Sequence, residues 1–251
     1  SGKGGDILYR WGNPAGYNNG TTADQKLFGQ HDVHWIEENL KDEGKLMIFN
    51  NGQGRGYSSI DIINPTIDIN GNYILTNNTF GPNNADWTYI DPNPQDFYSS
   101  YISGAQRLPN GNTLICDGAH GTFFEIDSTE TQVWKYINPV VNSGPLTQGD
   151  PIPVTSNGWE NPTFRCTRYS PSYSAFDGLN LSPGNFIELN PLPSNCQMTL
   201  SINQNSPQNT NRELIYITDI LGRETTNQPN TLLFYIYDDG TIEKKIIVKE
   251  N

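Results

Sequence analysis

The chain offers few side chains for acid-base or nucleophilic chemistry, because it has only three histidines, His31, His34 and His120. An imidazole exchanges a proton near neutral pH and can also act as a nucleophile. Arg55 closes an Asn-Gly loop, and a guanidinium is well shaped to hold the tetrahedral oxygens of an anion. Two imidazoles and this guanidinium in one place would suit an anionic group, with one histidine attacking it or abstracting a proton.

Repeated short strands must position these residues. Three aromatic-rich segments end at Asn-Pro or Asp-Pro, a pair that favours turns and cannot continue a strand ladder; they are residues 8–14, 87–92 and 134–139. Between the last two ends lie four strand-like runs, at 105–108, 112–116, 122–126 and 132–137. The same order recurs before them, at 31–36, 45–50, 58–63 and 87–90. Four antiparallel strands repeated as a unit predict all-β blades of a β-propeller.

The number of units predicts how the chain is divided. Two whole blades are fewer than the roughly four to eight of a propeller, so we expect the chain to begin inside a domain that a missing N-terminal part completes. We assign residues 1–193 to this propeller part, with an insertion around 66–80. From 194 to 251 the pattern changes to cleaner strands with an Asp-Asp-Gly hairpin turn, which predicts a separate small β-sandwich.

The blade topology predicts which residues meet. In an antiparallel meander, the start of the first strand and the loop between the second and third strands lie at the same end. His31, Arg55 and His120 should therefore share one rim, and Asn51 and Tyr57, from the Arg55 loop, are assigned to substrate binding. His34 should point to the opposite strand face, which favours packing over metal binding. The alternative for Arg55 and His120 is a solvated arginine and an ordinary turn histidine.

Composition excludes several function classes. The 27 acidic residues outnumber 15 basic ones, and a formal charge of -12 argues against nucleic acid as a partner. No apolar run approaches the roughly 18 residues of a membrane span, and no signal peptide is visible at the start. The glycine-rich loop at 52–56 lacks the Lys-Ser/Thr ending of a phosphate-binding loop, so we expect no nucleotide cofactor. Cys116 is predicted to be a buried thiol, while a disulfide between Cys166 and Cys196 is left open.

Four sequence blocks resemble a known family. They are Gly-Asp-Ile-Leu-Tyr-Arg-Trp-Gly-Asn-Pro at 5–14, Phe-Gly-Gln-His-Asp at 28–32, Ile-Phe-Asn-Asn-Gly at 48–52 with Arg55, and Gly-Ala-Gln-Arg-Leu-Pro-Asn-Gly-Asn-Thr-Leu at 104–114. Together they resemble the arylsulfotransferase (aryl-sulfate sulfotransferase) family over about residues 5–190. The resemblance implies an exported bacterial protein with a six-bladed propeller. It also implies ping-pong transfer of a sulfuryl group from an aryl sulfate to a phenol through a sulfated histidine, without phosphoadenosine phosphosulfate.

The resemblance assigns roles to three residues. His31 matches the Gln-His block, Arg55 matches the arginine that closes the Asn-Gly loop, and His120 falls where the nucleophilic histidine is expected. Val33 replaces an asparagine of the family, and a further histidine of the family would lie before Ser1. These departures keep an alternative open, which is a secreted or cell-surface β-propeller that binds a ligand without turnover.

The end of the chain has a second resemblance. Residues 217–224, 235–241 and 243–245 resemble the C-terminal sorting domain of type IX secretion cargo in Bacteroidetes. This implies passage through the periplasm to the cell surface or medium, with the type IX secretion machinery as a partner. Whether the tail is cleaved is left open.

Overall fold

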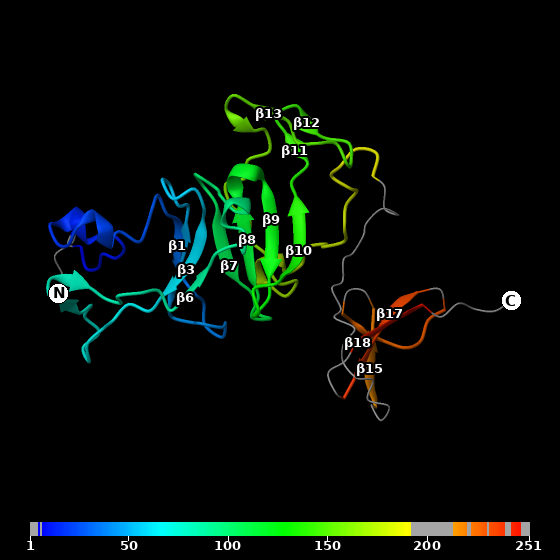
Figure 1. Ribbon diagram of the computed structural model, residues 1–251. Helices are drawn as coiled ribbons and strands as arrows, with labels where there is room; N and C mark the ends of the chain where they lie inside the picture. Colours follow the sequence, from blue (N-terminus) through cyan, green and yellow to red (C-terminus); the bar gives the residue numbers. More distant parts are fainter. Residues whose placement is uncertain are drawn as a thin grey trace. The chain divides into compact units, whose positions relative to one another are not determined.

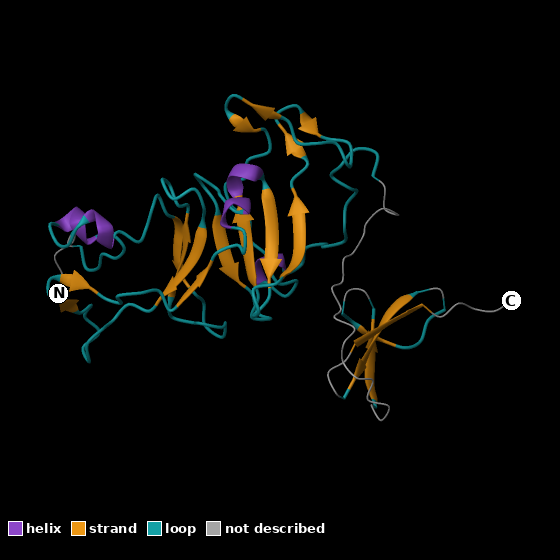
Figure 2. Ribbon diagram, viewed as in Figure 1, coloured by secondary structure: helices purple, strands orange, loops and turns teal. Residues whose placement is uncertain are grey.

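The structure is a computed structural model that describes residues 5, 7–191, 213–219, 222–229, 231–238 and 242–246. The chain divides into two compact units, Ser1–Leu200 and Ser201–Asn251. Within the described residues, all regular elements are antiparallel β-strands or single turns of 3-10 helix (Figure 2). The prediction of an all-β chain is therefore confirmed. None of the helices described is long and apolar enough to cross a bilayer.

Two four-stranded antiparallel sheets form the centre of the first unit (Figure 1). The first contains, in order, β1 (His31–Trp35), β2 (Leu46–Asn50), β3 (Ser59–Ile63) and β6 (Trp87–Tyr89). The second contains, in order, β7 (Gly104–Arg107), β8 (Thr113–Asp117), β9 (Thr122–Ile126) and β10 (Gln132–Ile137). Between β3 and β6 the chain makes a small hairpin of β4 (Leu75–Thr76) and β5 (Thr79–Phe80). The two sheets thus repeat one strand order.

The main core lies between these two sheets. Its side chains come from alternate strand positions that face the other sheet: Met47, Phe49, Ile60 and Ile62 from the first, and Ala105, Ile115, Phe124 and Ile126 from the second. Phe97 joins them from the segment between the sheets, with its ring centroid 5.6 Å from that of Phe49 and 5.4 Å from that of Phe124. Full burial of each large apolar side chain contributes about 1.5–3 kcal/mol, so this layer holds the sheets face to face.

The other face of the first sheet is also covered. Ile48 and Ile63 point away from the main core and pack with Leu27, and Tyr9 and Trp11 lie against them. The tryptophan Nε1–H donates to the carbonyl oxygen of Pro82 at 2.7 Å. All five residues of β3 are buried because both faces of this strand are covered.

The leading strands of the two sheets lie close together. β7 packs against β1 and β2. Arg107, almost fully buried, pairs with Asp42 at 2.9 Å and lies over the Trp87 ring at 5.1 Å. The backbone N–H of Ala105 donates to Asp32 at 3.2 Å. Polar as well as apolar contacts therefore join the sheets.

Residues 140–191 contain little regular structure. Two short hairpins lie there, β11 (Val140–Val141) with β12 (Gly144–Pro145), and β13 (Val154–Thr155) with β14 (Gly158–Trp159). No sheet closes into a ring within the described part of the chain, so the propeller stays a prediction.

The second unit has one four-stranded antiparallel sheet among its described residues. Its order is β16 (Glu224–Thr225), β15 (Leu214–Thr218), β17 (Leu232–Tyr237) and β18 (Ile242–Ile246). Leu233, Tyr235 and Thr218 are the buried residues among those that the structure describes in this sheet. The predicted sandwich needs a second sheet and stays a prediction; the boundary at 193 and the cysteine at 196 lie outside the described residues.

Candidate functional site

The predicted site residues lie at one end of the two sheets. His31 begins β1 and pairs with Phe49, and the connection 51–58 follows β2 at that same end. In the second sheet, Asp117 and Thr122 pair where β8 turns into β9, and His120 lies in the short 3-10 turn η4 (Gly118–His120) between them. These connections are equivalent in the two sheets, so the shared strand order brings them to equivalent ends.

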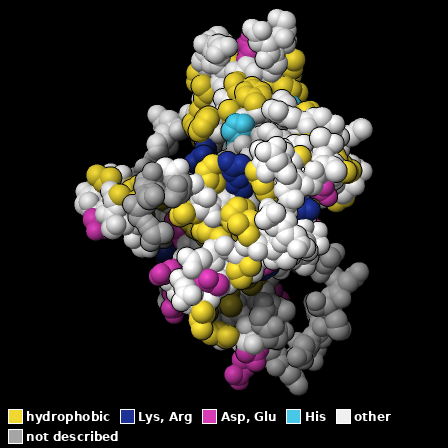
Figure 3. All heavy atoms as spheres, turned by 90° about the vertical axis from the view of Figure 1, so that its left-hand side faces the viewer, with side chains coloured by type: hydrophobic (Ala, Val, Ile, Leu, Met, Phe, Trp, Pro, Cys, Tyr) yellow, Lys and Arg dark blue, Asp and Glu magenta, His cyan; other side chains and the backbone are white. Residues whose placement is uncertain are grey.

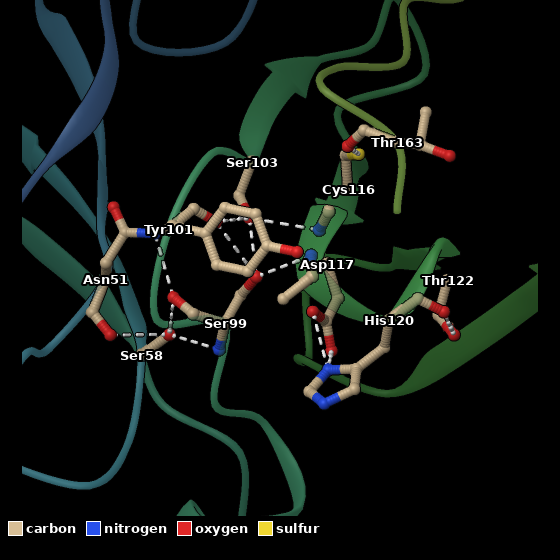
Figure 4. Close-up of polar contacts among 12 residues, drawn as sticks. Asn51, Ser58, Ser99, Tyr101, Ser103, Cys116, Asp117, His120, Thr122 and Thr163 are labelled. Carbon is tan, nitrogen blue, oxygen red and sulfur yellow. Dashed lines mark hydrogen bonds and ion pairs between the residues drawn. The ribbon is translucent and has the colours of Figure 1, made fainter. Parts of the chain in front are cut away.

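Three buried serines connect the loop 51–58 of the first sheet with the turn η4 of the second (Figure 4). They are Ser58, Ser99 and Ser103, and we call them the serine bridge. The Ser103 hydroxyl donates to Ser99 Oγ at 2.7 Å. Toward the second sheet, Ser99 Oγ accepts the Ala119 backbone N–H at 2.9 Å, and Ser103 Oγ accepts that of Gly118 at 3.0 Å. Two side-chain oxygens, from Ser99 and Ser103, thus hold the turn η4 that carries His120.

The serine bridge also holds the loop of the first sheet. Ser58 Oγ donates to the Asn51 carbonyl oxygen at 2.9 Å and accepts the Ser99 backbone N–H at 2.9 Å. The Asn51 side-chain amide donates to the carbonyl oxygens of Ser99 at 2.8 Å and Ile102 at 2.9 Å. Since a buried polar atom without a partner costs about 1–3 kcal/mol, these bonds fix both connections in one arrangement.

Asn51 orients His31. Both N–H groups of the amide are used, so its Oδ1 is the atom that faces His31 Nδ1, at 2.7 Å. Nδ1 therefore carries the proton, and Nε2 carries the lone pair. Asn51 is fully buried, and this burial gives it a positioning role in the structure. Its part in substrate binding stays a prediction.

His120 is held by a carboxylate. Its Nδ1 lies 2.9 Å and 2.8 Å from the two carboxylate oxygens of the nearly buried Asp117 (Figure 4). The hydrogen bond to Asp117 raises the pKa of His120, while partial burial opposes the increase. The ring packs edge-on against Trp159 with centroids 5.4 Å apart. In the neutral ring with Nδ1–H donated to the carboxylate, Nε2 carries the lone pair and can act as a nucleophile or base.

His120 and Asp117 line a cavity of about 1310 Å³. Its lining includes five aromatic rings, from Phe97, Tyr98, Phe124, Tyr136 and Trp159. It also includes the amine of Lys135 and five carboxyl groups, from Asp91, Asp96, Asp117, Asp150 and Glu188. The aromatic rings can pack against the ring of a small aromatic ligand, and polar side chains line the rest of the cavity. Neither His31 nor Arg55 is among the described residues that line it.

The Arg55 guanidinium lies over two aromatic rings. Its guanidinium carbon is 4.5 Å from the centroid of the Tyr57 ring and 5.1 Å from that of Phe28, and Nη2 donates to Ser59 Oγ at 3.1 Å. The tight loop needs Gly52, since a Cβ there would lie 1.7 Å from the Tyr57 carbonyl oxygen. No carboxylate pairs with Arg55 among the described residues, so its charge is available to an anion.

The structure shows two contacts and one connection among the predicted residues. His31 contacts Asn51, Arg55 contacts Tyr57, and the turn that carries His120 is linked to Asn51 through the serine bridge. The side-chain hydrogen bonds of Arg55 go to Tyr57 and Ser59, and not to either of these histidines. On the face in Figure 3, a histidine lies near basic side chains, which are Lys or Arg, with hydrophobic groups around them. No group of three or more metal-ligating side chains occurs in the described ranges.

The model of the arylsulfotransferase (ASST) family matches residues 19–148, just over half of the 251 residues. The chain belongs to the arylsulfotransferase family. The matched range contains His31, Arg55 and His120. No curated protein and no solved structure matches the chain.

Two contacts of this arylsulfotransferase chain were missed by the sequence reasoning. Asp117 comes three residues before His120, a spacing that one 3-10 turn brings together, so the Cys-Asp-Gly-Ala-His run carried a usable signal. Trp159 lies in a different hairpin, and no local pattern links it to His120.

We expect Asp117→Asn to lower the pKa of His120, because the substitution removes the negative partner of the imidazolium. The folded-state pKa is raised, so the pair stabilises the fold fully below the unfolded value near 6.5 and loses this effect as pH rises through the folded value. The variant should therefore lose more stability at pH 5.5 than at pH 8.5 relative to wild type. NMR titration of His120 and urea unfolding at both pH values measure this.

Asp150→Asn is the matched control for that substitution, since Asp150 lines the same cavity without a contact to the His120 ring. An unchanged His120 pKa in Asp117→Asn would contradict the assigned contact.

Proposed function

We propose that the chain transfers a sulfuryl group from an aryl sulfate to a phenol through a sulfated His120. The observation that carries this proposal is the His120–Asp117 pair at the wall of a cavity that five aromatic rings help to line. Membership of the arylsulfotransferase family supports the reaction class. In this proposal the aryl ring occupies the cavity, and the sulfuryl group lies at its His120 end.

The reaction has two displacements at sulfur. His120 Nε2 attacks the sulfur of the donor, an N–S bond forms, the S–O bond to the aryl group breaks, and the phenolate leaves and takes up a proton. Asp117 keeps the Nδ1 proton and stabilises the positive charge of the substituted ring. The oxygen of a second phenol then attacks sulfur and gives its proton to solvent, the N–S bond breaks, and His120 is released as a neutral imidazole.

Arg55 and His31 assist in this proposal. Arg55 neutralises charge on the sulfuryl oxygens, a role that fits its position without a carboxylate partner among the described residues and its guanidinium geometry. His31, with its Nε2 lone pair, acts as acid, base or oxygen ligand. Both lie at the same end of the sheets as His120, and this shared position supports giving them one task.

We further infer that the two sheets are consecutive blades of a six-bladed propeller. Their strand order is the same, and β7, the first strand of the second sheet, packs against β1 and β2 of the first. Blades around a channel approach each other in this way through their innermost strands. The loops with His31, Arg55 and His120 would then open toward one mouth of the ring.

One observation favours a second candidate, a propeller that binds aryl sulfates without turnover. Val33 is 52% exposed in β1, where the resembled family has an asparagine. An exposed valine cannot supply the amide hydrogen bonds of that asparagine to a substrate or transition state.

We expect His120→Asn in the full-length protein to lower kcat for release of nitrophenol from a nitrophenyl sulfate by about 10³-fold or more, because the nucleophile is lost. His34→Asn is the matched control and should retain activity. In the wild type, rapid quenching and peptide mass spectrometry should find one added sulfuryl group on the His120 peptide. Normal phenol release by His120→Asn would contradict the proposal, and donor bound without any sulfated histidine would favour the binding module.

We also propose export to the cell surface or medium through the type IX machinery. The motifs at 217–224 and 235–241 support it, together with a compact C-terminal unit that has its own sheet. A separately folded tail can be read by an export receptor without disturbing the first unit.

Deletion of residues 213–251 in a Bacteroidetes host should retain the protein in the periplasm, as measured by cell fractionation. His120→Asn, which leaves the tail intact, should be exported like wild type. Surface delivery of the truncated protein would contradict this location.

A further inference from the structure

Two cysteines outside the candidate site lie against each other. Cys116 is fully buried in β8, and Cys166 belongs to residues 161–168, a segment that we call the strap. The two thiols are close enough to form a hydrogen bond. Cys116 Sγ also lies 3.7 Å from the carbonyl oxygen of Thr163, another residue of the strap (Figure 4).

Contacts that involve no sulfur hold the strap in this position. They lie on both sides of Cys166: the Thr163 N–H donates to the Gly118 carbonyl oxygen at 2.8 Å, the Ser103 N–H to that of Phe164 at 3.1 Å, and the Arg168 N–H to Gln106 Oε1 at 2.8 Å. Arg165 pairs with Asp32 of the first sheet at 2.9 Å. The meeting of the thiols is therefore imposed by the fold.

The two thiols differ in reactivity. The hydrogen bond from Cys116 lowers the pKa of Cys166, burial opposes this, and the nearby Arg168 lowers it further. The same hydrogen bond, with burial, raises the pKa of Cys116. Cys166 lines a small cavity of about 180 Å³, whereas Cys116 is fully buried. Since the thiolate is the nucleophile, Cys166 is the thiol that an external disulfide would meet first.

We propose that Cys116 and Cys166 form a disulfide that fastens the strap to β8 when the protein meets an oxidising low-molecular-weight disulfide. The Cys166 thiolate attacks one sulfur of oxidised glutathione, and one glutathione thiolate leaves. Cys116 then gives up its proton and attacks the Cys166 sulfur of the mixed disulfide, and the second glutathione leaves. Two protein thiols are oxidised, and one glutathione disulfide is reduced to two glutathione thiols.

This crosslink would act near the His120 turn. The strap residue Thr163 donates to the carbonyl oxygen of Gly118, the first residue of η4. A covalent bond at Cys166 restricts the separation of the strap from this turn and closes a long chain loop, which stabilises the fold by limiting the unfolded chain.

The test is incubation of the full chain with oxidised glutathione, followed by alkylation, digestion without reductant and mass spectrometry. We expect a peptide pair joined through Cys116 and Cys166, and a Tm about 5–10 °C above that of the reduced protein. Cys196→Ser should retain the crosslink and the Tm increase, and Cys166→Ser should lose both.

Two results would overturn the proposal. One is a natively folded, oxidant-treated protein in which Cys116 and Cys166 both remain open to alkylation after unfolding. The other is a crosslink from Cys166 to Cys196 in place of Cys116. Because Cys166→Ser changes a strap residue and leaves the buried Cys116 in place, the comparison does not depend on a core substitution.

Discussion

A buried chain of hydrogen bonds fixes the positions of the two connections that carry the candidate residues. The serine bridge has no exposed members, and each hydroxyl serves the backbone or side chain of a connection that carries a candidate residue. A hydroxyl buried without a partner costs about 1–3 kcal/mol, so a shift of either connection would break several bonds together. The bridge thereby makes the loop of one sheet and the turn of the other behave as one rigid support.

On this support, each of the two imidazole rings is oriented by an oxygen atom that faces its Nδ1. Asn51 accepts the Nδ1 proton of His31, and Asp117 accepts that of His120. Each ring is then left with its Nε2 lone pair, but the acceptors differ in charge. The carboxylate of Asp117 stabilises positive charge on the His120 ring and raises its pKa. In the proposed reaction this favours His120 as the nucleophile, because the first step leaves the ring positively charged.

Part of this arrangement could be predicted from the sequence because turn chemistry is local. The repeated Asn-Pro and Asp-Pro ends located the strands, and the shared strand order placed His31, Arg55 and His120 at one end. What could not be predicted depends on long-range contacts. The side-chain amide of Asn51 donates to the carbonyl oxygens of Ser99 and Ile102, which lie in the segment between the two sheets. The strap, which follows the second sheet in the chain, contacts Cys116. No sequence period encodes such meetings.

The central claim is that the serine bridge positions His120 for attack, and the burst of phenol release in the first turnover measures that attack directly. The account predicts that Ser99→Ala in the full-length protein folds but slows the burst by about 10–100-fold, because the η4 turn loses the oxygen that holds its Ala119 N–H. Thr129→Ala, on an exposed turn at the far end of the second sheet, should leave the burst unchanged. A wild-type burst rate in folded Ser99→Ala would contradict the account.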